Sequence, residues 1–428
     1  MITVLVLAFF GGLLLSMPVV FALALGCAAA LLWQGRLPGT IVPQQIIAAI
    51  DSAPLLAIPL FILFGELVSR GSIGTRLVAL CEALVGWIRG GLAHANVLAS
   101  IFFGGISGAA TADTVAVGSV MIPEMKRRGY PAGFSAVVTC TSSVIGNLIP
   151  PSIDLIIFAW LTGTPVDRLF AAGLAPGVLI GFALMAISYA ICRRNGYGAP
   201  LGFSALLLGK RLGEAGPTLL LPLIILGGIF TGIFTVTESA AIAFVYGLAL
   251  TFVVYRDLPL SALGGLLRDS VVSIGSIMFL LATAKVFGWI LTVERVPQNL
   301  TAFLTTHMPS PELFSINVIL VSLLAGCFLT PATALIILTP ILHPIAMAMG
   351  FDPLHFGILL LSSLALGHVT PPVGLTLFIA SGLSGEPIDR LMRPLLPFLL
   401  ALIVAVLIIA YVPAVTLTLP EMLWGTGR

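Results

Sequence analysis

Uninterrupted apolar runs of about twenty residues recur along the whole chain, and they limit its fold more than any other feature. Examples are Pro217–Val254, Asp269–Val293 and Leu395–Val415. A helix needs about 20 such residues to cross the hydrocarbon of a membrane, whereas barrel strands would alternate over segments of about ten residues. Because unpaired backbone groups are costly in lipid, the runs predict membrane-spanning helices.

The composition agrees with this interpretation. Of the 428 residues, 59% are hydrophobic and only 8% are charged, whereas soluble domains carry roughly 25% charged residues. So little charge cannot solvate the surface of a chain this long, and we expect an all-α polytopic membrane protein. The sequence leaves open whether the segment 1–33 forms one long helix or two shorter ones.

Two halves of the chain share an ordered set of short strings. Gly146-Asn-Leu-Ile-Pro-Pro151 recurs as Gly367-His-Val-Thr-Pro-Pro372, and Pro165-Val-Asp-Arg-Leu169 recurs as Pro387-Ile-Asp-Arg-Leu391. These and other matches keep their order and a nearly constant offset, the one that separates Gly146 from Gly367. They predict a duplication, with a first repeat at 1–190, a polar cytoplasmic link at 191–215 and a second repeat at 216–418.

The basic residues indicate that the two repeats have opposite orientations. Lys126-Arg127-Arg128 in the first half corresponds to the uncharged Met347-Ala348-Met349 in the second. By the positive-inside rule, the first of these loops is cytoplasmic and its counterpart is not. This asymmetry is typical of an inverted-topology repeat. Arg168 would then lie on the periplasmic side, against the rule.

Each half contains a segment that is difficult to fit as a simple span. Residues 96–123 and 318–344 each have a turn rich in Gly and Thr between two apolar arms of about ten residues. Arms of that length are too short to cross as helices but suit a re-entrant helical hairpin. The alternative is a single spanning helix that packs closely on a neighbour through its glycines.

A broken helix is expected after each hairpin, at about 134–162 and 356–383. Each contains a Pro-Pro pair that disfavours helix at the residues before it, which leaves backbone carbonyls unpaired. Such carbonyls, together with Ser, Thr and Asn oxygens, suit a small hard cation. The half-helix that follows begins with the positive end of its dipole, which attracts anions. A kink used only for packing is the alternative.

Few ionisable residues lie within the apolar runs, and such residues are functional candidates. Asp113 follows the first hairpin turn and could shape the cation site or fasten the hairpin. Asp154 follows Pro151 and could cap the half-helix or bind a ligand. Lys285 could pair with a carboxylate or meet an anionic substrate, and His368 occupies the position that matches Asn147. Glu238 is expected to cap a helix.

No nucleotide-binding loop or catalytic motif occurs in the sequence. The chain is therefore not expected to be an enzyme, and transport must use an ion gradient or a partner. Three classes remain: a sodium-coupled transporter subunit, a stand-alone ion or organic-anion exchanger or channel, and an intramembrane enzyme, for which no catalytic set is found.

The residues from Gly105 to Pro123, with Lys126–Tyr130 and Gly146–Ser152, resemble the large membrane subunit of tripartite ATP-independent periplasmic (TRAP) transporters. The string Gly227–Ala241 does so too, and the likeness covers essentially the whole chain. Where many members have Gly-Ser, this chain has Gly108-Ala109, which removes a hydroxyl at the first hairpin turn.

This resemblance implies a multi-pass protein of the bacterial inner membrane, surrounded by lipid, with a fold like that of the ion-transporter superfamily and an elevator motion. It implies import of a small carboxylate-bearing organic acid with Na⁺, a small four-helix membrane subunit and a periplasmic binding protein as partners, and no nucleic acid. By position, two sodium sites are expected. The first comprises Gly105, Ser107, Ser142, Gly146, Asn147 and Pro150, and the second comprises Gly326, Thr330, Gly367, Thr370 and Val373.

Overall fold

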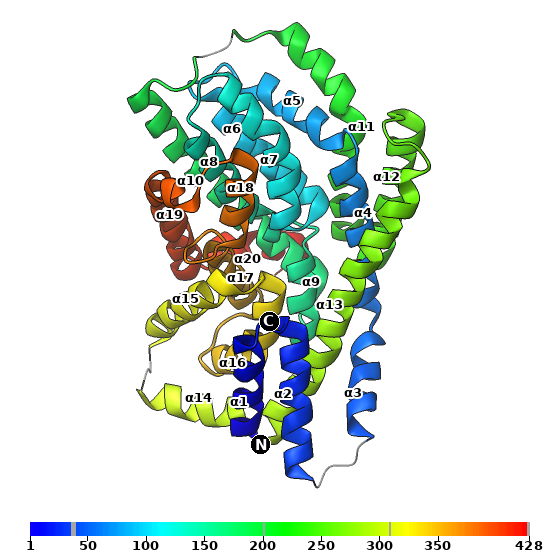
Figure 1. The fold of residues 1–428 in the computed structure, drawn as a ribbon, viewed down its shortest axis with the longest axis vertical. Helices are drawn as coiled ribbons and strands as arrows, with labels where there is room; N and C mark the ends of the chain where they lie inside the picture. Colours follow the sequence, from blue (N-terminus) through cyan, green and yellow to red (C-terminus); the bar gives the residue numbers. More distant parts are fainter. Residues whose placement is uncertain (36–39, 200–201, 308–309, 426–428) are drawn as a thin grey trace.

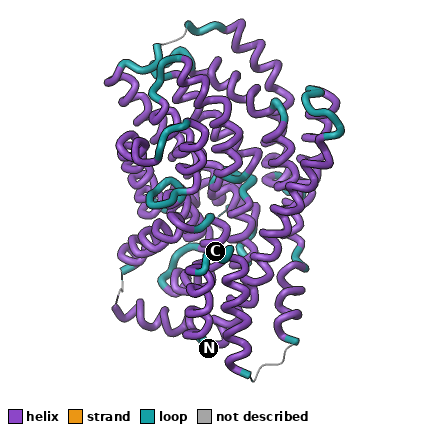
Figure 2. Tube along the Cα trace, in the orientation of Figure 1, coloured by secondary structure: helices purple, strands orange, loops and turns teal. Residues whose placement is uncertain are grey.

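The computed structural model describes residues 1–428 except 36–39, 200–201, 308–309 and 426–428, and this described part contains helices and loops but no strands (Figure 2). The helices are α1 (Ile2–Leu14), α2 (Val19–Gln34), α3 (Ile41–Ile50), η1 (Ala53–Leu56), α4 (Ala57–Arg70), α5 (Ile73–Val85), α6 (Gly91–Ser107), α7 (Ala110–Arg127), α8 (Ala132–Ser143), η2 (Val144–Asn147), α9 (Ile153–Thr162), α10 (Val166–Asn195), α11 (Ala205–Phe230), α12 (Val236–Leu248), η3 (Ala249–Val254), α13 (Ala262–Val293), α14 (Val296–His307), α15 (Pro311–Phe328), α16 (Pro331–Ala348), α17 (Pro353–Gly367), α18 (Leu375–Ser384), α19 (Ile388–Tyr411) and α20 (Ala414–Trp424).

The prediction of an all-helical, multi-spanning membrane protein is confirmed. Within the described ranges, eight helical segments are long and apolar enough to cross a membrane. Many large apolar side chains on these helices point outward, among them Phe182, Leu223 and Leu400. In water such a surface would aggregate, but in lipid it is the expected exterior.

The segment 1–33 forms two helices, which settles the question that the sequence left open. The chain turns between α1 and α2 at Ser16, which has a φ of +61°, and the two helices pack against each other. Helices α2 and α3 also pack against the long helix α13, on the lower side of the molecule in Figure 1. The helices α4, α11 and α12 also pack together, on the side where α13 runs.

Two helical hairpins are formed by α6 with α7 and by α15 with α16. Their arms are 17 to 18 residues long, so the expectation of arms of about ten residues within 96–123 and 318–344 is wrong. The helices extend beyond the apolar windows because polar residues such as His94 and Asn96 are buried by protein. At 1.5 Å per residue, each arm is about 26 Å long, close to a membrane's hydrocarbon thickness, so the arms are not too short to cross.

A break without regular helix follows each hairpin. The first separates η2 from α9, and the second separates α17 from α18. The peptide bonds Pro150–Pro151 and Pro371–Pro372 are both cis. The predicted polar link at 191–215 includes helix at both ends, because α10 continues to Asn195 and α11 begins at Ala205. Only its middle is irregular, and 200–201 lie outside the described residues.

The half-helices that follow the breaks pack against the other half of the chain. Helix α9 packs on α16, whereas α18 packs on α7 and α8. The long helices after them, α10 and α19, also pack against each other. In Figure 1, α6 and α7 lie in the upper part of the molecule and α15 and α16 in the lower part. The two hairpin-and-break units thus contact each other through exchanged half-helices.

Candidate functional site

The first hairpin and the first break touch at a pair of glycines. A Cβ on Gly104 would lie 2.8 Å from the Cα of Gly146, so Gly104 has no room for a side chain, whereas a Cβ on Gly146 would lie 3.5 Å from the Cα of Gly104, an ordinary contact. The sequence analysis selected the neighbouring Gly105, and not Gly104, for the first sodium site. The structure shows that Gly105 instead faces Ile149 and the carbonyl oxygen of Pro150, each 3.6 Å from where a Cβ would stand. Both glycines of α6 therefore line the break, on adjacent sides.

Asn147 joins the first break to the second arm of the hairpin. Its Oδ1 accepts a hydrogen bond of 3.0 Å from the backbone N–H of Ala110, at the start of α7. Its backbone carbonyl accepts a second hydrogen bond, of 2.7 Å, from the hydroxyl of Ser152. The Nδ2 atom is buried and has no partner among the described residues. The side chain that the sequence proposed as a cation ligand thus also caps α7.

The first hairpin turn lies against the carbonyl of the second proline. Gly108 adopts φ +65°, and a Cβ there would be 2.2 Å from the carbonyl oxygen of Pro151. The N–H of Ile153 donates to the carbonyl of Gly108, with an N···O distance of 3.4 Å. The hydroxyl of Ser107 is buried and has no partner within the described part of the chain. This turn is therefore fixed by backbone contacts and retains one free hydroxyl.

A buried polar cluster lies behind this turn, between α6, α7 and α8. The carboxylate of Asp113 is fully buried beside the hydroxyls of Ser100 and Ser143, and neither of its oxygens forms a regular hydrogen bond to a described residue. Ser100 Oγ and Ser142 Oγ are hydrogen-bonded at 2.9 Å. In addition, Asn96 Nδ2 donates to Thr139 Oγ1 at 2.7 Å.

This cluster connects Asp113 with Ser142, a residue of the expected first sodium site. The sequence analysis did not identify Asn96, Ser100, Thr139 and Ser143 as members. Their spacing is a signal that could have found them, because Asn96 and Ser100 are four residues apart, as are Thr139 and Ser143, and residues at that spacing share one helix face.

The second hairpin touches the second break through an equivalent pair of glycines. A Cβ on Gly326 would be 2.5 Å from the carbonyl oxygen of Leu364, and one on Gly367 would be 2.7 Å from the Cα of Gly326. Cys327, which the sequence did not select, adds two contacts. Its carbonyl accepts from Gly374 N–H at 3.2 Å, and its Sγ lies 3.5 Å from the carbonyl oxygen of Pro371.

The remaining hydroxyls of the expected second site bond near their own positions in the chain and do not join the hairpin to the break. Thr330 Oγ1 accepts from the N–H of Thr333 and so caps its own helix α16, while Thr370 Oγ1 donates to the carbonyl of Leu366. Val373 is 41% exposed. Both ring nitrogens of His368 are buried without a partner within the described ranges.

The candidate charges lie in different surroundings. Asp154 is buried in the first turn of α9, but Ser152 provides the capping hydrogen bond, so capping is not the role of Asp154. Lys285 forms no ion pair with a described residue, and its Nζ lies 5.6 Å from the ring centroid of Trp160. Glu238 forms the expected capping box with Thr235.

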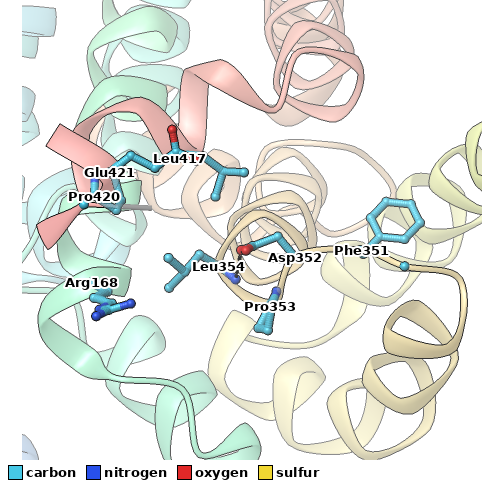
Figure 3. A pocket seen from close by; sticks show the side chains of 10 residues that line it. Arg168, Phe351, Asp352, Pro353, Leu354, Leu417, Pro420 and Glu421 are labelled. Carbon is cyan, nitrogen blue, oxygen red and sulfur yellow. Dashed lines mark hydrogen bonds between the residues drawn. The ribbon is translucent and has the colours of Figure 1, made fainter. Parts of the chain in front are cut away.

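A separate cavity of about 620 Å³ lies beside the start of α17, away from both breaks (Figure 3). Arg168 lines it together with Asp352 and Glu421, which face the same space from the start of α17 and from α20. The carboxylate of Asp352 accepts from the N–H of Leu354 at 2.8 Å. Carboxylates near Arg168 reduce the local positive charge, which explains how this arginine can depart from the charge pattern of the other loops.

The groups at the two crossings would suit a cation that binds oxygen. Each crossing brings a glycine of a hairpin against a glycine of a break, so no side chain separates the two backbones there. Hydroxyls and amide oxygens surround the first crossing, and no group of three or more His, Cys, Asp or Glu residues is found in the described ranges. Hard oxygen ligands of this kind suit Na⁺, whereas a transition metal would prefer imidazole or thiolate.

Comparison with known proteins gives a consistent result across the chain. Residues 6–415 match the family described as "Tripartite ATP-independent periplasmic transporter, DctM component". The chain is 42% identical over 372 residues to the C4-dicarboxylate TRAP transporter large permease protein DctM of Pseudomonas aeruginosa, covering 86% of each chain. It is 37% identical to the sialic acid TRAP transporter large permease protein SiaM of Vibrio cholerae, covering 98% of each.

Among solved structures, the fold is similar to that of the YdaH transporter of Alcanivorax borkumensis. The TM-score is 0.61, and 87% of each chain is covered, at 16% sequence identity. At that identity the likeness concerns the fold alone.

Proposed function

Because this chain belongs to the DctM family of tripartite ATP-independent periplasmic transporters, we propose that it imports a small carboxylate-bearing organic acid together with Na⁺. Members of this family are permease subunits and not enzymes, and the chain is accordingly a membrane component of a three-part transporter. The observation that carries the sodium proposal is the pair of crossings, at Gly104 with Gly146 and at Gly326 with Gly367.

One sodium ion is proposed at each crossing. Because the glycines have no side chains, backbone carbonyl oxygens are the nearest available ligands. Such ligands favour a small cation that binds oxygen. At the first crossing, Ser107, Ser142 and Asn147 supply further oxygens. The second has Thr330 and Thr370. Asp113 lies behind the first crossing, linked to Ser142 through Ser100, and we infer that its negative charge favours a cation there.

An elevator motion is supported by the exchange of half-helices. Because α9 packs on α16 and α18 packs on α7 and α8, the two hairpins and the two breaks form one connected body. In the proposal this body moves as a unit, and the chain forms it from two inverted repeats. Helix α4 contacts α5, and α13 contacts α14, at the edges of this body. We propose that α4 and α13 belong to the part of the protein that stays fixed in the membrane.

The substrate is proposed to be an organic acid because the named relatives carry C4-dicarboxylates and sialic acid, both of which have carboxylates. In this chain, the N-terminal ends of α9 and α18 follow the two breaks and present the positive ends of their dipoles. His368, Asp154 and Lys285 remain candidates for substrate contact. A small four-helix subunit, a periplasmic binding protein and an inner-membrane location complete the proposal.

Reconstitution tests this function. Uptake of a radiolabelled C4-dicarboxylate into vesicles should require an inward Na⁺ gradient, the small subunit and the binding protein. Gly367→Leu and Thr370→Leu should abolish sodium stimulation, because both place bulk at the second crossing. Flux that is unchanged when the binding protein is left out would instead support a stand-alone exchanger or channel.

A further inference from the structure

A second large cavity, of about 870 Å³, lies between the start of α8, the last turns of α10 and the first turns of α19. Three arginines line it, Arg194 from α10 and Arg390 and Arg393 from α19, and we call it the arginine cavity. It is remote from Arg168 and the cavity of Figure 3, and neither hairpin-and-break crossing contributes a lining residue.

The charge within the arginine cavity is strongly one-sided. Glu386 is the one carboxylate among its lining residues, and it pairs with Arg390 at 3.3 Å. Neither Arg194 nor Arg393 makes an ion pair or a side-chain hydrogen bond within the described part of the chain. Two guanidinium groups on different helices therefore face the same space without a counter-ion. Guanidinium groups are favoured partners of phosphate, which each can bind through two parallel N–H donors.

Apart from Asn195 and Tyr197, the remaining walls are apolar and continue onto the exterior of the protein. Ile187 and Ile191 of α10 face Pro394 and Pro397 of α19 across the cavity. Beyond it, Leu396 and Leu400 of α19 are 58% and 63% exposed. They follow Arg393 by three and seven residues and so lie on the same face of the helix. An exposed apolar stripe thus leads from the arginine into the membrane-spanning part of α19.

The cavity lies at the more basic end of the molecule. Lys126 Nζ donates to the carbonyl of Ser384 at 3.1 Å, which places the end of α7, with its Lys126-Arg127-Arg128 run, beside the end of α18 and the start of α19. Under the proposed orientation, this end faces the cytoplasm, where anionic lipids attract basic segments of membrane proteins.

We propose that the arginine cavity binds the headgroup of an anionic phospholipid of the cytoplasmic leaflet. The phosphate bridges Arg194 and Arg393, and an acyl chain lies along Leu396 and Leu400. A lipid fits better than a free anion because much of the cavity wall is apolar and opens toward the membrane-facing stripe. Since α8 and α10 belong to the first half of the chain and α19 to the second, the lipid holds the two halves together at this end.

The test is lipid binding by the purified full chain in detergent, followed by its thermal unfolding and by native mass spectrometry. Phosphatidylglycerol should raise the melting temperature, and phosphatidylcholine should not. Arg194→Gln/Arg393→Gln should weaken the apparent affinity for phosphatidylglycerol by about thirtyfold, as expected for two lost charges at a membrane surface. Arg89→Gln/Arg168→Gln removes the same charge outside the cavity and should leave the affinity unchanged.

Several results would overturn this proposal. One is an equal response to both lipids, and another is an unaltered response of the Arg194→Gln/Arg393→Gln protein. A full shift with glycerol 3-phosphate alone would identify a site for free anions. A shift with succinate that depends on the same arginines would identify a vestibule for the transported acid. These measurements need no transport, so they are independent of sodium coupling.

Discussion

The two hairpin-and-break crossings share a plan but differ in how the hairpin is held. In the first, Asn147 of the break caps α7 of the hairpin. In the second, the matching residue is His368, which makes no such bond, and α16 is capped by its own Thr330. The first break is buried throughout, including both prolines, whereas Pro372 and Val373 of the second are exposed.

The polar interiors of the two hairpins differ as well. Asp113 corresponds to Ala334 or Leu335, depending on the offset, and Thr139 and Ser143 correspond to Leu360 and Leu364. The second hairpin thus has no carboxylate at the position of Asp113, and its one acidic residue among the described positions, Glu312, lies in the first turn of α15. We infer that the first crossing is a fixed, charge-balanced site and that the second is the mobile one, open to exchange. Each prediction below tests this difference, at matched positions where the chain offers them.

The largest effect is expected at the first hairpin turn. Gly108→Ala would place a Cβ 2.2 Å from the carbonyl oxygen of Pro151, at a φ of +65°. Both the clash and the left-handed backbone oppose folding, and we expect the free energy of unfolding to fall by more than about 3 kcal/mol. The melting temperature and the yield of folded protein measure it.

Gly374→Ala is a comparable change at the second break, at another glycine with a left-handed backbone. Its φ is +55°, but the nearest atom to the new Cβ would be the carbonyl oxygen of Thr370, at 3.1 Å. We expect a folded protein that is less stable by about 1–2 kcal/mol. Equal damage from the two alanines would remove the distinction between a fixed and a mobile crossing.

The next largest effect is expected from removal of the buried charge of Asp113. Asp113→Asn keeps the size of the side chain but removes its charge. We expect the Na⁺ concentration for half-maximal uptake to rise about tenfold or more. The reason is that a carboxylate near a cation site of low polarity contributes more than about 1.4 kcal/mol to the binding of the cation. Asp154→Asn, a buried carboxylate in α9, serves as the control and should change this value little. Reduced stability with unchanged sodium dependence would assign Asp113 a purely structural role.

The sequence predicted the order of these elements well, because hydrophobic runs, Gly-rich turns and Pro-Pro pairs act locally. It missed the lengths of the arms, since His94 and Asn96 are polar yet buried against other helices. It selected Gly105, which faces the carbonyl oxygen of Pro150, but did not select Gly104, which makes the contact with Gly146. One residue along a helix rotates a position by about 100°, and only packing decides which glycine faces the break.

Side-chain partnerships across elements were beyond the sequence for a similar reason. Asn147 was selected as a ligand, but its bond to Ala110 depends on how closely α7 approaches η2. Likewise, Asp113 was identified as an intramembrane charge, while Ser100 was not identified as its neighbour. Such contacts follow from tertiary packing, which a pattern of residue types along one chain does not encode.

Accessibility provides a test without transport. Val373→Cys should react with a membrane-impermeant maleimide, because this position is 41% exposed, and added Na⁺ should slow the reaction. Ser152→Cys, at the matching position of the first break, should not react because Ser152 is fully buried. All five native cysteines are buried, so the background is low. Labelling of both positions at similar rates would show that the first break is as open as the second.

The smallest effect is expected from a matched pair of serines, Ser142 and Ser363. Ser142 Oγ bonds Ser100 Oγ at 2.9 Å and connects to the Asp113 cluster, whereas Ser363 Oγ bonds only the carbonyl of Leu359, within its own helix. Ser142→Ala should therefore weaken Na⁺ activation by about fivefold, for one lost hydrogen bond of about 1 kcal/mol. Ser363→Ala should change it by less than about twofold. The reverse order would place the more tightly coupled sodium ion at the second crossing, and the Asp113 cluster would then serve stability alone.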